Sequence, residues 1–445
     1  MAHRVAVPQE LLIGSSLTAT QAATATILRC LHTLVAAPEI VFLATLAAML
    51  FRPPDLPFHS LDRIAFLLLS SVVVLKILLE RQPFQIPILV TWPMFGLLLL
   101  GFFSLLSQPY DPQNWSVFAA KWAVPFAFYE ISGLVFQDAA SLRRLELFLF
   151  AVLGYLSLVA VLFLLDASQF VLPPYIVNEH LGIHADRARG PFLQAVANGV
   201  TLNMLALIGL DSFRRRRLGG LPALFFFVGV PLAIVATKTR AVWLSFAGSV
   251  AWLVICSNVR VRRPCIFLIL AGTVVTLLGR TFADANTSLS SRLEDSSPVE
   301  FRLVIYQTAL DMFREKPFLG WNSNQVQPEL AKRIYDFHQT AFFFHNTYLE
   351  IAVAHGLFGV LFYAWLILDL FRVGRSCRPH LPNQEGGFLD EGFRSIWPVL
   401  LAVYLLNASF VVMNYQFVNA LLFTIAGLLS AQNHTARARL QAFRD

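Results

Sequence analysis

Charged residues are scarce in this chain of 445 residues. Lys, Arg, Asp and Glu together make up 14% of it, well below the roughly 25% of an ordinary soluble domain. Apolar residues make up 57%, and 40 residues are Phe. This composition excludes a soluble globular enzyme, a disordered chain and a nucleic-acid-binding module. The net charge is +7. In a membrane protein such an excess typically reflects arginines in the cytoplasmic loops, which keep those loops in the cytoplasm.

Cysteines are also few, and no cleavable signal peptide is recognised. The only cysteines are Cys30, Cys256, Cys265 and Cys377, and their spacing is not that of metal ligands. A disulfide framework is therefore not expected. The N-terminus lacks a compact basic-then-apolar segment with a small-residue cleavage site. We therefore expect the first membrane spans to act as their own uncleaved signal.

Long apolar runs dominate the rest of the sequence. About 20 apolar residues cross the hydrocarbon core of a bilayer. Twelve ranges qualify, namely 28–51, 63–80, 86–107, 114–136, 146–166, 192–211, 219–237, 240–257, 264–280, 346–371, 394–413 and 416–431. The sequence predicts an all-α polytopic membrane protein with one transmembrane domain over residues 28–431. Cytoplasmic tails are expected at residues 1–27 and 432–445.

The arginines are unevenly shared between alternate loops. With the N-terminus in the cytoplasm, most of them fall on the cytoplasmic side, including the run Arg214 to Arg217. The short loops on the other side hold fewer cations, which are Arg52, Arg63, Arg187, Arg189, Lys238 and Arg240. The positive-inside rule then predicts that both termini are cytoplasmic.

One polar segment, residues 281–345, is much longer than a connection between spans requires. It lies on the outer side in this topology. Ser297-Pro298 predicts the start of a helix within it and Lys316-Pro317 predicts its end. A second helix is expected from near Pro328 toward Phe337. Long ordered loops usually have a function, so we expect this one to contribute to a site.

Side chains with useful chemistry gather at the outer ends of the predicted spans. They are Arg187, Arg189, Lys238, Arg240 and His345. Arginine forks suit phosphate oxygens in charge and geometry. A histidine that is neutral at pH 7 can take a proton from a hydroxyl. Cations beside one base predict a reaction on a lipid-linked phosphate or pyrophosphate.

Simpler interpretations stand beside this one. Arginines at span ends often reach to lipid headgroups, and a histidine at a helix start is often only a cap. Lys121 lies inside a predicted span, on the opposite helix face from Glu130, and intramembrane charges are functional candidates by default. His180 and His184 have a spacing that metal ligands use, but Gly182 between them favours a loop, and no metal site is expected.

Four motifs, in order along the chain, carry a family resemblance. They are Gly190-x-Phe192 with Asn198; Thr237-x-Thr239-Arg240-Ala241; Arg302-x-x-x-Tyr306-x-x-Ala309-Leu310-x-Met312 with Pro317-x-x-Gly320; and His345-Asn346-x-Tyr348-Leu349 with Gly356-Leu357-Phe358-Gly359. Together they resemble the O-antigen ligase and polysaccharide polymerase superfamily of bacterial inner-membrane proteins. The long outer loop before the span at 346–371 fits the same plan.

The resemblance implies a GT-C-like helical fold. It also implies an inverting transfer of a glycan from undecaprenyl pyrophosphate to an acceptor hydroxyl on the periplasmic side, with no metal or cofactor. In ligases the acceptor is a core sugar of lipid A. His345 matches the histidine proposed to activate the acceptor hydroxyl, and Arg240 matches the arginine proposed to hold the pyrophosphate. Arg189, or else Arg187, matches a second phosphate-binding arginine.

Further candidates complete the predicted site. Lys238 is a third cation for the pyrophosphate, and the candidates for orienting the acceptor are Asn346, Tyr348, Arg302 and Lys121. Two positions depart from the family pattern. Gly320-Trp321-Asn322 stands where the family often has Gly-x-Gly, and threonines replace the serines before Arg240.

Three alternatives to a ligase remain open at this point. A polymerase would join repeat units on the same lipid carrier, and an oligosaccharyltransferase would glycosylate a protein hydroxyl. Both use the same donor, so the donor motifs do not separate them from a ligase. A transporter of lipid-linked oligosaccharides would be expected to show two similar halves, and the sequence shows no such repeat.

Overall fold

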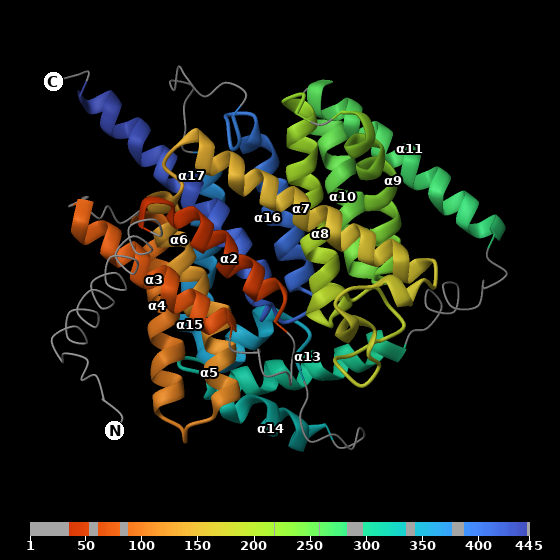
Figure 1. Cartoon of the computed structure of the whole chain (residues 1–445). Helices are drawn as coiled ribbons and strands as arrows, with labels where there is room; N and C mark the ends of the chain where they lie inside the picture. Colours follow the sequence, from red (N-terminus) through yellow and green to blue (C-terminus); the bar gives the residue numbers. More distant parts are fainter. Residues whose placement is uncertain are drawn as a thin grey trace, which may run out of the picture.

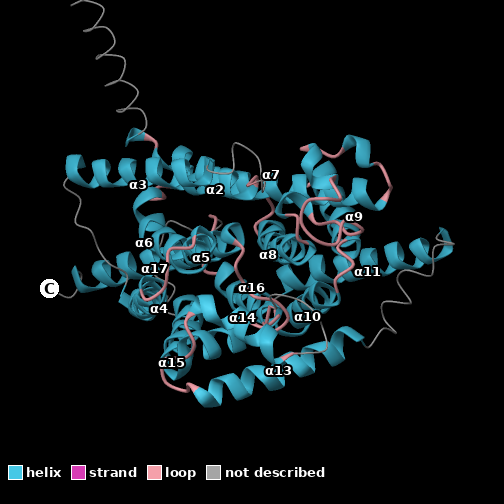
Figure 2. Ribbon diagram, turned by 90° about the horizontal axis from the view of Figure 1, so that it is seen from below, coloured by secondary structure: helices cyan, strands magenta, loops and turns pink. Residues whose placement is uncertain are grey.

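The computed structural model describes residues 35–52, 61–80, 88–217, 219–257, 259–282, 297–334, 343–375 and 387–442. Within these ranges the chain is helical and contains no strand (Figures 1 and 2). The α-helices are α2 (Pro38–Leu50), α3 (Leu61–Glu80), α4 (Ile88–Leu106), α5 (Pro112–Phe118), α6 (Val124–Val135), α7 (Ala139–Leu164), α8 (Ala195–Arg214), α9 (Gly220–Ala236), α10 (Arg240–Cys256), α11 (Val259–Phe282), α13 (Ser297–Glu315), α14 (Ser323–Arg333), α15 (Thr347–Arg375), α16 (Phe393–Ala408) and α17 (Gln416–Ala442).

Helices occupy all twelve predicted span ranges where the structure describes them. Four of them are long and apolar enough to cross a membrane by themselves, at Leu89–Leu106, Ala139–Leu164, Ala195–Arg214 and Thr347–Arg375. The all-helical fold is thus confirmed, whereas the count of twelve spans and the GT-C-like arrangement stay predictions. The predicted tail at 1–27 lies outside the described residues, and α17 continues through the predicted tail at 432–445 as far as Ala442.

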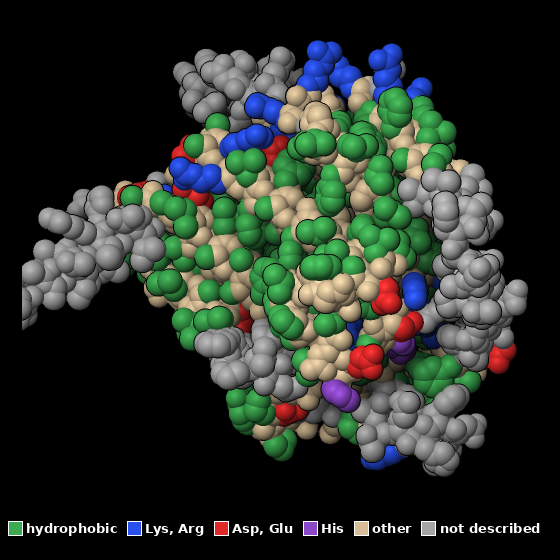
Figure 3. Space-filling view, turned by 45° about the vertical axis from the view of Figure 1, so that its right-hand side comes forward, with side chains coloured by type: hydrophobic (Ala, Val, Ile, Leu, Met, Phe, Trp, Pro, Cys, Tyr) green, Lys and Arg blue, Asp and Glu red, His purple; other side chains and the backbone are tan. Residues whose placement is uncertain are grey.

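The surface has a broad apolar zone and one strongly basic end. Figure 3 shows apolar side chains over the middle of the molecule, with Lys and Arg gathered at its upper end. Figure 1 places the turns from α8 to α9 and from α10 to α11 at that end. Leu221 and Ile255 are 80% and 73% exposed, as expected for side chains that face lipid rather than water. We call this basic end the Arg215 end and the opposite one the His345 end.

The long polar loop crosses the His345 end. Figure 1 shows α13 lying across the lower end of the bundle, with α14 beside it. Ile305 and Met312 of α13, Leu330 of α14 and Val353 of α15 share a small core of their own. The predicted helix from Ser297 is confirmed, and it ends at Glu315, before the predicted stop.

The prediction for the second loop helix was wrong at its start. The helix α14 begins at Ser323, so Pro328 lies inside it. Val326 and Leu330 are four residues apart and both are buried in the small core. Burial of Val326 stabilises the helical turn before Pro328. This packing depends on other segments of the chain, so the proline alone could not predict it. Phe337, the expected end, lies outside the described residues.

The predicted span at 346–371 is a broken helix. Gly356 interrupts α15 with φ 61° and ψ −157°. The loop after α13 supplies partners for the interrupted backbone: Trp321 N–H donates to the Val353 carbonyl at 2.7 Å, and Leu357 N–H donates to the Pro317 carbonyl at 2.7 Å. A Cβ on Gly356 would lie 2.2 Å from the Phe318 oxygen. The motifs around Pro317 and Gly356 therefore form one interlocked contact, which satisfies backbone groups at a membrane helix break.

A second irregularity lies in the predicted span at 114–136. Residues Ala119–Ala123 form a π-helical turn between α5 and α6. Pro125 follows it and has no N–H to give to the preceding turn. The Asn419 side-chain amide donates instead to the Ala120 carbonyl at 3.1 Å. Such bulges change the direction of the side chains they contain, and this one contains Lys121.

Candidate active site

The turn between α9 and α10 presents Arg240 at the His345 end. Ala236 ends α9, and Arg240 is the first residue of α10 and is exposed. The Thr237 hydroxyl donates to the Ile234 carbonyl at 2.7 Å, and the Thr239 hydroxyl donates to the Thr237 carbonyl at 2.8 Å. Both hydroxyls therefore stabilise the turn. The serines that are usual in the family pattern could form the same hydrogen bonds. The predicted spans at 219–237 and 240–257 leave only Lys238 and Thr239 between them, which predicts a tight hairpin, and the structure confirms it.

The loop before α8 lies against this turn. Ala188 N–H donates to the Ala236 carbonyl at 3.0 Å, and the Asn198 amide donates to the Ala188 carbonyl at 2.9 Å. Gly190 has φ 56°, and a Cβ on it would lie 2.8 Å from the Asn198 side-chain oxygen. The Gly190 and Asn198 motif thus fixes the loop next to the turn. As a result, Arg187 lies beside the turn that carries Arg240.

Arg187 and Arg189 have different environments. The Arg189 side chain is buried, and its guanidinium donates to three backbone carbonyls of residues 176–181 at 2.5 to 2.9 Å. It fastens that segment of the loop. Arg187 is more accessible, with 18% of its side chain exposed, and it lies 3.9 Å from Asp186. Of the two, Arg187 is the better placed to meet an anion from outside.

His345 lies directly before α15, with a left-handed backbone (φ 50°) and a half-buried side chain. Burial lowers the pKa of its imidazole below the usual value, and electrostatic interactions with Arg302 and His184 lower it further. The ring is therefore neutral at pH 7. Arg302 comes from α13, and His184 is tied by a turn to Arg187, whose N–H donates to the His184 carbonyl at 3.1 Å. His345, α13 and the loop that carries Arg187 thus meet at one place.

The first turn of α15 is held by polar side chains. The Asn346 side-chain oxygen accepts from two amides of this turn, at 2.9 and 3.1 Å, and so caps the helix. The Thr347 hydroxyl donates to the Val411 carbonyl at 2.8 Å, and the Tyr348 hydroxyl donates to the Leu405 carbonyl at 2.8 Å. Asn346 and Tyr348 were predicted to orient the acceptor. In the structure these polar atoms form hydrogen bonds to the backbone, and these bonds fix the start of α15 directly after His345.

Lys121 lies in a different part of the same end. It forms an ion pair with Glu350 of α15, and its amine lies 5.3 Å from the centre of the Trp122 ring. The pair lines a cavity whose walls contain none of the turn residues at 237–240. Sequence reasoning identified Lys121 but missed Glu350. The sequence does show an acidic residue near the start of the predicted span at 346–371. It does not show which cation pairs with that residue.

An apolar groove begins near Arg240 and extends along α10 into the apolar zone of the molecule. It has a volume of about 400 Å³ and lies between α9, α10 and α11. Its lining includes Val235 of α9, Trp243 and Phe246 of α10, and Ile269 of α11. Trp243 follows Arg240 by less than one turn, so the groove begins within one helical turn of Arg240.

A family model described as O-Antigen ligase matches residues 222–364. These residues form an O-antigen ligase domain. No curated protein matches the chain. The ligase domain belongs to a family of membrane enzymes of the O-antigen ligase and polymerase type, which transfer glycosyl groups. The chain is accordingly a multi-pass membrane protein of a bacterial inner-membrane family.

The ligase domain includes Arg240, the loop helices and His345, and the rest of the site comes from outside it. Arg187, Arg189 and Lys121 precede the matched residues. The hydrogen bond from Ala188 to Ala236 and the ion pair of Lys121 with Glu350 join these earlier segments to the ligase domain.

Proposed function

We propose that this protein is an O-antigen ligase. It transfers a glycan from undecaprenyl pyrophosphate to a hydroxyl of a lipid A core sugar, at the His345 end, which faces the periplasm. One observation carries the proposal: the loop at 184–188 joins His345 to the turn that carries Arg240, and an apolar groove begins within one helical turn of Arg240. A base, an anion site and a lipid groove are the three parts that this reaction needs.

The donor lipid is held at two places. Arg240, Arg187 and Lys238 bind the pyrophosphate, since all three belong to the turn and the loop packed on it. The isoprenoid chain lies in the groove between α9, α10 and α11. Arg189 supports this arrangement by fastening the loop from within. Binding both parts of the donor at once fixes its anomeric carbon relative to His345.

The chemistry is a single displacement. The acceptor hydroxyl attacks the anomeric carbon, its proton passes to His345, and the bond from that carbon to the pyrophosphate oxygen breaks. Attack from the side opposite the leaving group inverts the anomeric centre. The cations stabilise the charge that grows on the pyrophosphate, so the leaving group needs no proton. Arg302 and burial keep His345 in the form that accepts a proton.

The distribution of charge supports a periplasmic site. Lys and Arg gather at the Arg215 end (Figure 3), and basic ends of multi-pass proteins remain in the cytoplasm. With that end inside, the His345 end faces the periplasm and the C-terminus is cytoplasmic. Fusions of a periplasm-dependent reporter after Ser168 and after Arg216 test this: activity is expected only from the first, and the reverse pattern would invert the topology.

The test uses a strain that lacks this gene, complemented with the wild type, with His345→Ala or with His180→Ala. His180 is an exposed histidine of the loop at 165–194 and serves as the matched control. The strain without the gene should accumulate long glycans on undecaprenyl pyrophosphate and carry bare lipopolysaccharide. Wild type and His180→Ala should restore the lipopolysaccharide, and His345→Ala should not. Restoration by His345→Ala at normal protein level would overturn the assignment of the base.

The same extracts separate the alternatives. Accumulation of single repeat units, or loss of a secreted polymer, would show a polymerase whose acceptor is another lipid-linked chain. Loss of glycan from a protein with intact lipopolysaccharide would show an oligosaccharyltransferase. Consumption of the donor by the purified protein in detergent, where there is only one compartment, would exclude a transporter.

A further inference from the structure

A polar cavity opens at the His345 end on the other side of the first turns of α15. It has a volume of about 260 Å³ and lies between α4, α5, the π-helical turn, α14 and α15. Phe343 and Phe344, which directly precede His345, form one part of its wall, and His355 forms another. The cavity therefore runs along α15 from the loop that carries His345 to the break at Gly356.

The lining combines side-chain amides with aromatic rings. The amides belong to Gln113, Asn114, Gln327 and Asn414, and the rings include Trp122 and Phe118. The Asn414 side-chain oxygen is buried and accepts no hydrogen bond within the described part of the chain. A buried amide oxygen of this kind costs free energy unless a ligand or water supplies a donor.

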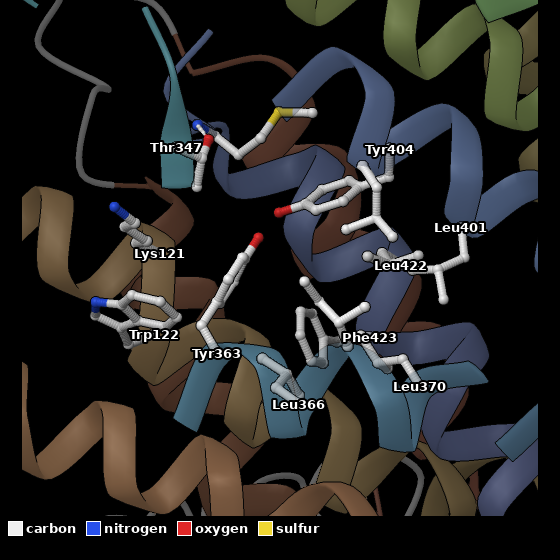
Figure 4. A pocket seen from close by; sticks show the side chains of 13 residues that line it. Lys121, Trp122, Thr347, Tyr363, Leu366, Leu370, Leu401, Tyr404, Leu422 and Phe423 are labelled. Atoms are coloured by element: carbon white, nitrogen blue, oxygen red, sulfur yellow. Dashed lines mark hydrogen bonds between the residues drawn. The ribbon is translucent and has the colours of Figure 1, made fainter. Parts of the chain in front are cut away.

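Three charged side chains line the cavity, and two of them form a pair. The third, Asp111, accepts hydrogen bonds from the Asn114 side-chain amide and from the Gln113 N–H. Lys121 and Glu350 form an ion pair whose side chains are 9% and 20% exposed. Lys121 and Trp122 also border a smaller cavity of about 20 Å³, in which the hydroxyls of Tyr363 and Tyr404 face one another (Figure 4). A paired lysine offers no net charge to a phosphate. The cavity thus differs from the cationic turn at 237–240, and its polar lining differs from the apolar groove.

These features select a class of ligand. Amides and a carboxylate can exchange hydrogen bonds with several hydroxyl groups at once, because they include both donors and acceptors. Aromatic rings offer flat apolar surface to a ring of the ligand. The volume is near the lower end, about 300 Å³, of small-molecule sites. A neutral sugar ring satisfies all of these conditions, whereas an isoprenoid chain or a pyrophosphate does not.

We propose that this cavity is an acceptor subsite that binds a sugar residue next to the one whose hydroxyl reacts. The proposal rests on the function proposed above. Glu350 lies about 4.5 Å along the helix axis from Thr347, the first residue of α15, and His345 precedes Thr347 by two residues. The acceptor glycan then lies along α15, with its reactive hydroxyl at His345 and the adjoining residue among Gln327, Asn414 and the Lys121–Glu350 pair.

The test fills the cavity. Gln327→Trp places a large ring in it, and Gln325→Trp is the matched control because Gln325 is exposed on α14 and does not line it. The assay uses purified protein in nanodiscs, a lipid-linked glycan donor, and lipopolysaccharide from the strain without this gene as acceptor. Gln327→Trp is expected to raise the KM for the acceptor by about tenfold or more, with the KM for the donor unchanged. Gln325→Trp is expected to match the wild type in both.

A second variant removes one amide without filling space. Asn414→Ala should raise the KM for the acceptor about threefold to tenfold, consistent with one buried hydrogen bond, and should leave the KM for the donor and the melting temperature unchanged. It keeps the test decisive if Gln327→Trp does not fold.

The outcomes separate this inference from the proposed function. If the wild type transfers glycan and both cavity variants keep its KM for the acceptor, the subsite is overturned and the ligase function stands. Equal effects of Gln327→Trp and Gln325→Trp would also overturn the subsite. If the wild type transfers no glycan to lipopolysaccharide, the ligase function fails and the subsite fails with it.

Discussion

The two ends of the bundle use charge in opposite ways. At the Arg215 end, carboxylates and guanidiniums alternate in a closed network. Arg215 bonds Glu146 at 2.6 Å and Asp211 at 2.7 Å, and Arg214 bridges Asp211 and Asp390. Each buried charge there has a partner of opposite sign, as buried ions require.

The His345 end has ion pairs too, such as Lys121 with Glu350, but the groups around His345 itself are rich in cations. Arg302 and His184 act electrostatically on His345, and the nearby turn and loop add the cations Lys238, Arg240 and Arg187. The first network holds helices together, whereas the second arrangement suits the anion site and the neutral base proposed above. The same kind of substitution should therefore have different consequences at the two ends.

Arg215→Ala should have the largest effect on stability. It removes the buried one of the two cations that pair with each of Glu146 and Asp211, and loss of one partner from a buried ion pair costs up to about 3–5 kcal/mol. The variant should show a much lower melting temperature and low yield in detergent. Arg216→Ala, at the exposed next residue, should stay within about 0.5 kcal/mol of the wild type. Equal stability of the two variants would show that the network is not structural.

Arg240→Ala should have the opposite profile. Loss of one donor that stabilises a leaving group typically lowers the rate about 100- to 1000-fold, and an exposed residue at a helix start contributes little to folding. We expect a matching loss in glycan transfer with an unchanged melting temperature. A variant that loses stability in proportion to its activity would place Arg240 with the structural arginines and remove it from the donor site.

Gly356→Ala tests how far the His345 end depends on its irregular backbone. Alanine is strained at the positive φ of this position, and its Cβ would meet the Phe318 oxygen, for a cost of about 1–3 kcal/mol. The melting temperature should fall, and so should activity, because Ala354 and His355, directly before the break, line the proposed acceptor cavity. Gly154→Ala is the control, since nothing lies within 4 Å of a Cβ there. Equal melting temperatures for the two variants would show that the contact with the loop at 317–321 is not needed.

Arg302→Gln should have the smallest effect, and this effect should appear in the pH dependence of the rate. Burial is the main cause of the low pKa of His345, and Arg302 is the second. Removal of this positive charge raises that pKa toward its usual value. Because the neutral ring is the active form, the acidic limb of the rate profile should move to higher pH. Arg314→Gln, on the same helix and paired with Asp311, should leave the profile in place. An unmoved limb in Arg302→Gln would separate Arg302 from His345.

Local patterns predicted much of this molecule. The apolar runs located the helices, and the two-residue gap at 238–239 predicted the hairpin that displays Arg240. The helix from Ser297 was also predictable, because its apolar periodicity and its proline stop lie within one segment. Such features depend on residues that are neighbours in sequence.

What could not be predicted depends on partners far away in the chain. The break at Gly356 exists because the loop at 317–321 supplies hydrogen bonds to it. The start of α14 depends on burial of Val326 against α13 and α15. Lys121 could be recognised as unusual, but only the fold pairs it with Glu350. Arg187 and Arg189 are equivalent in sequence, and only the structure shows which of them holds the loop.

The central claim is that His345 is the base in glycan transfer, and one measurement addresses it most directly. Purified wild type, His345→Ala and His180→Ala are supplied with lipid-linked glycan and acceptor, and the rate of transfer is followed at saturating concentrations of both. We expect His345→Ala to be slower by about 100- to 10,000-fold, with donor binding and melting temperature unchanged, and His180→Ala to match the wild type. A folded His345→Ala protein that transfers glycan at the wild-type rate would contradict the account.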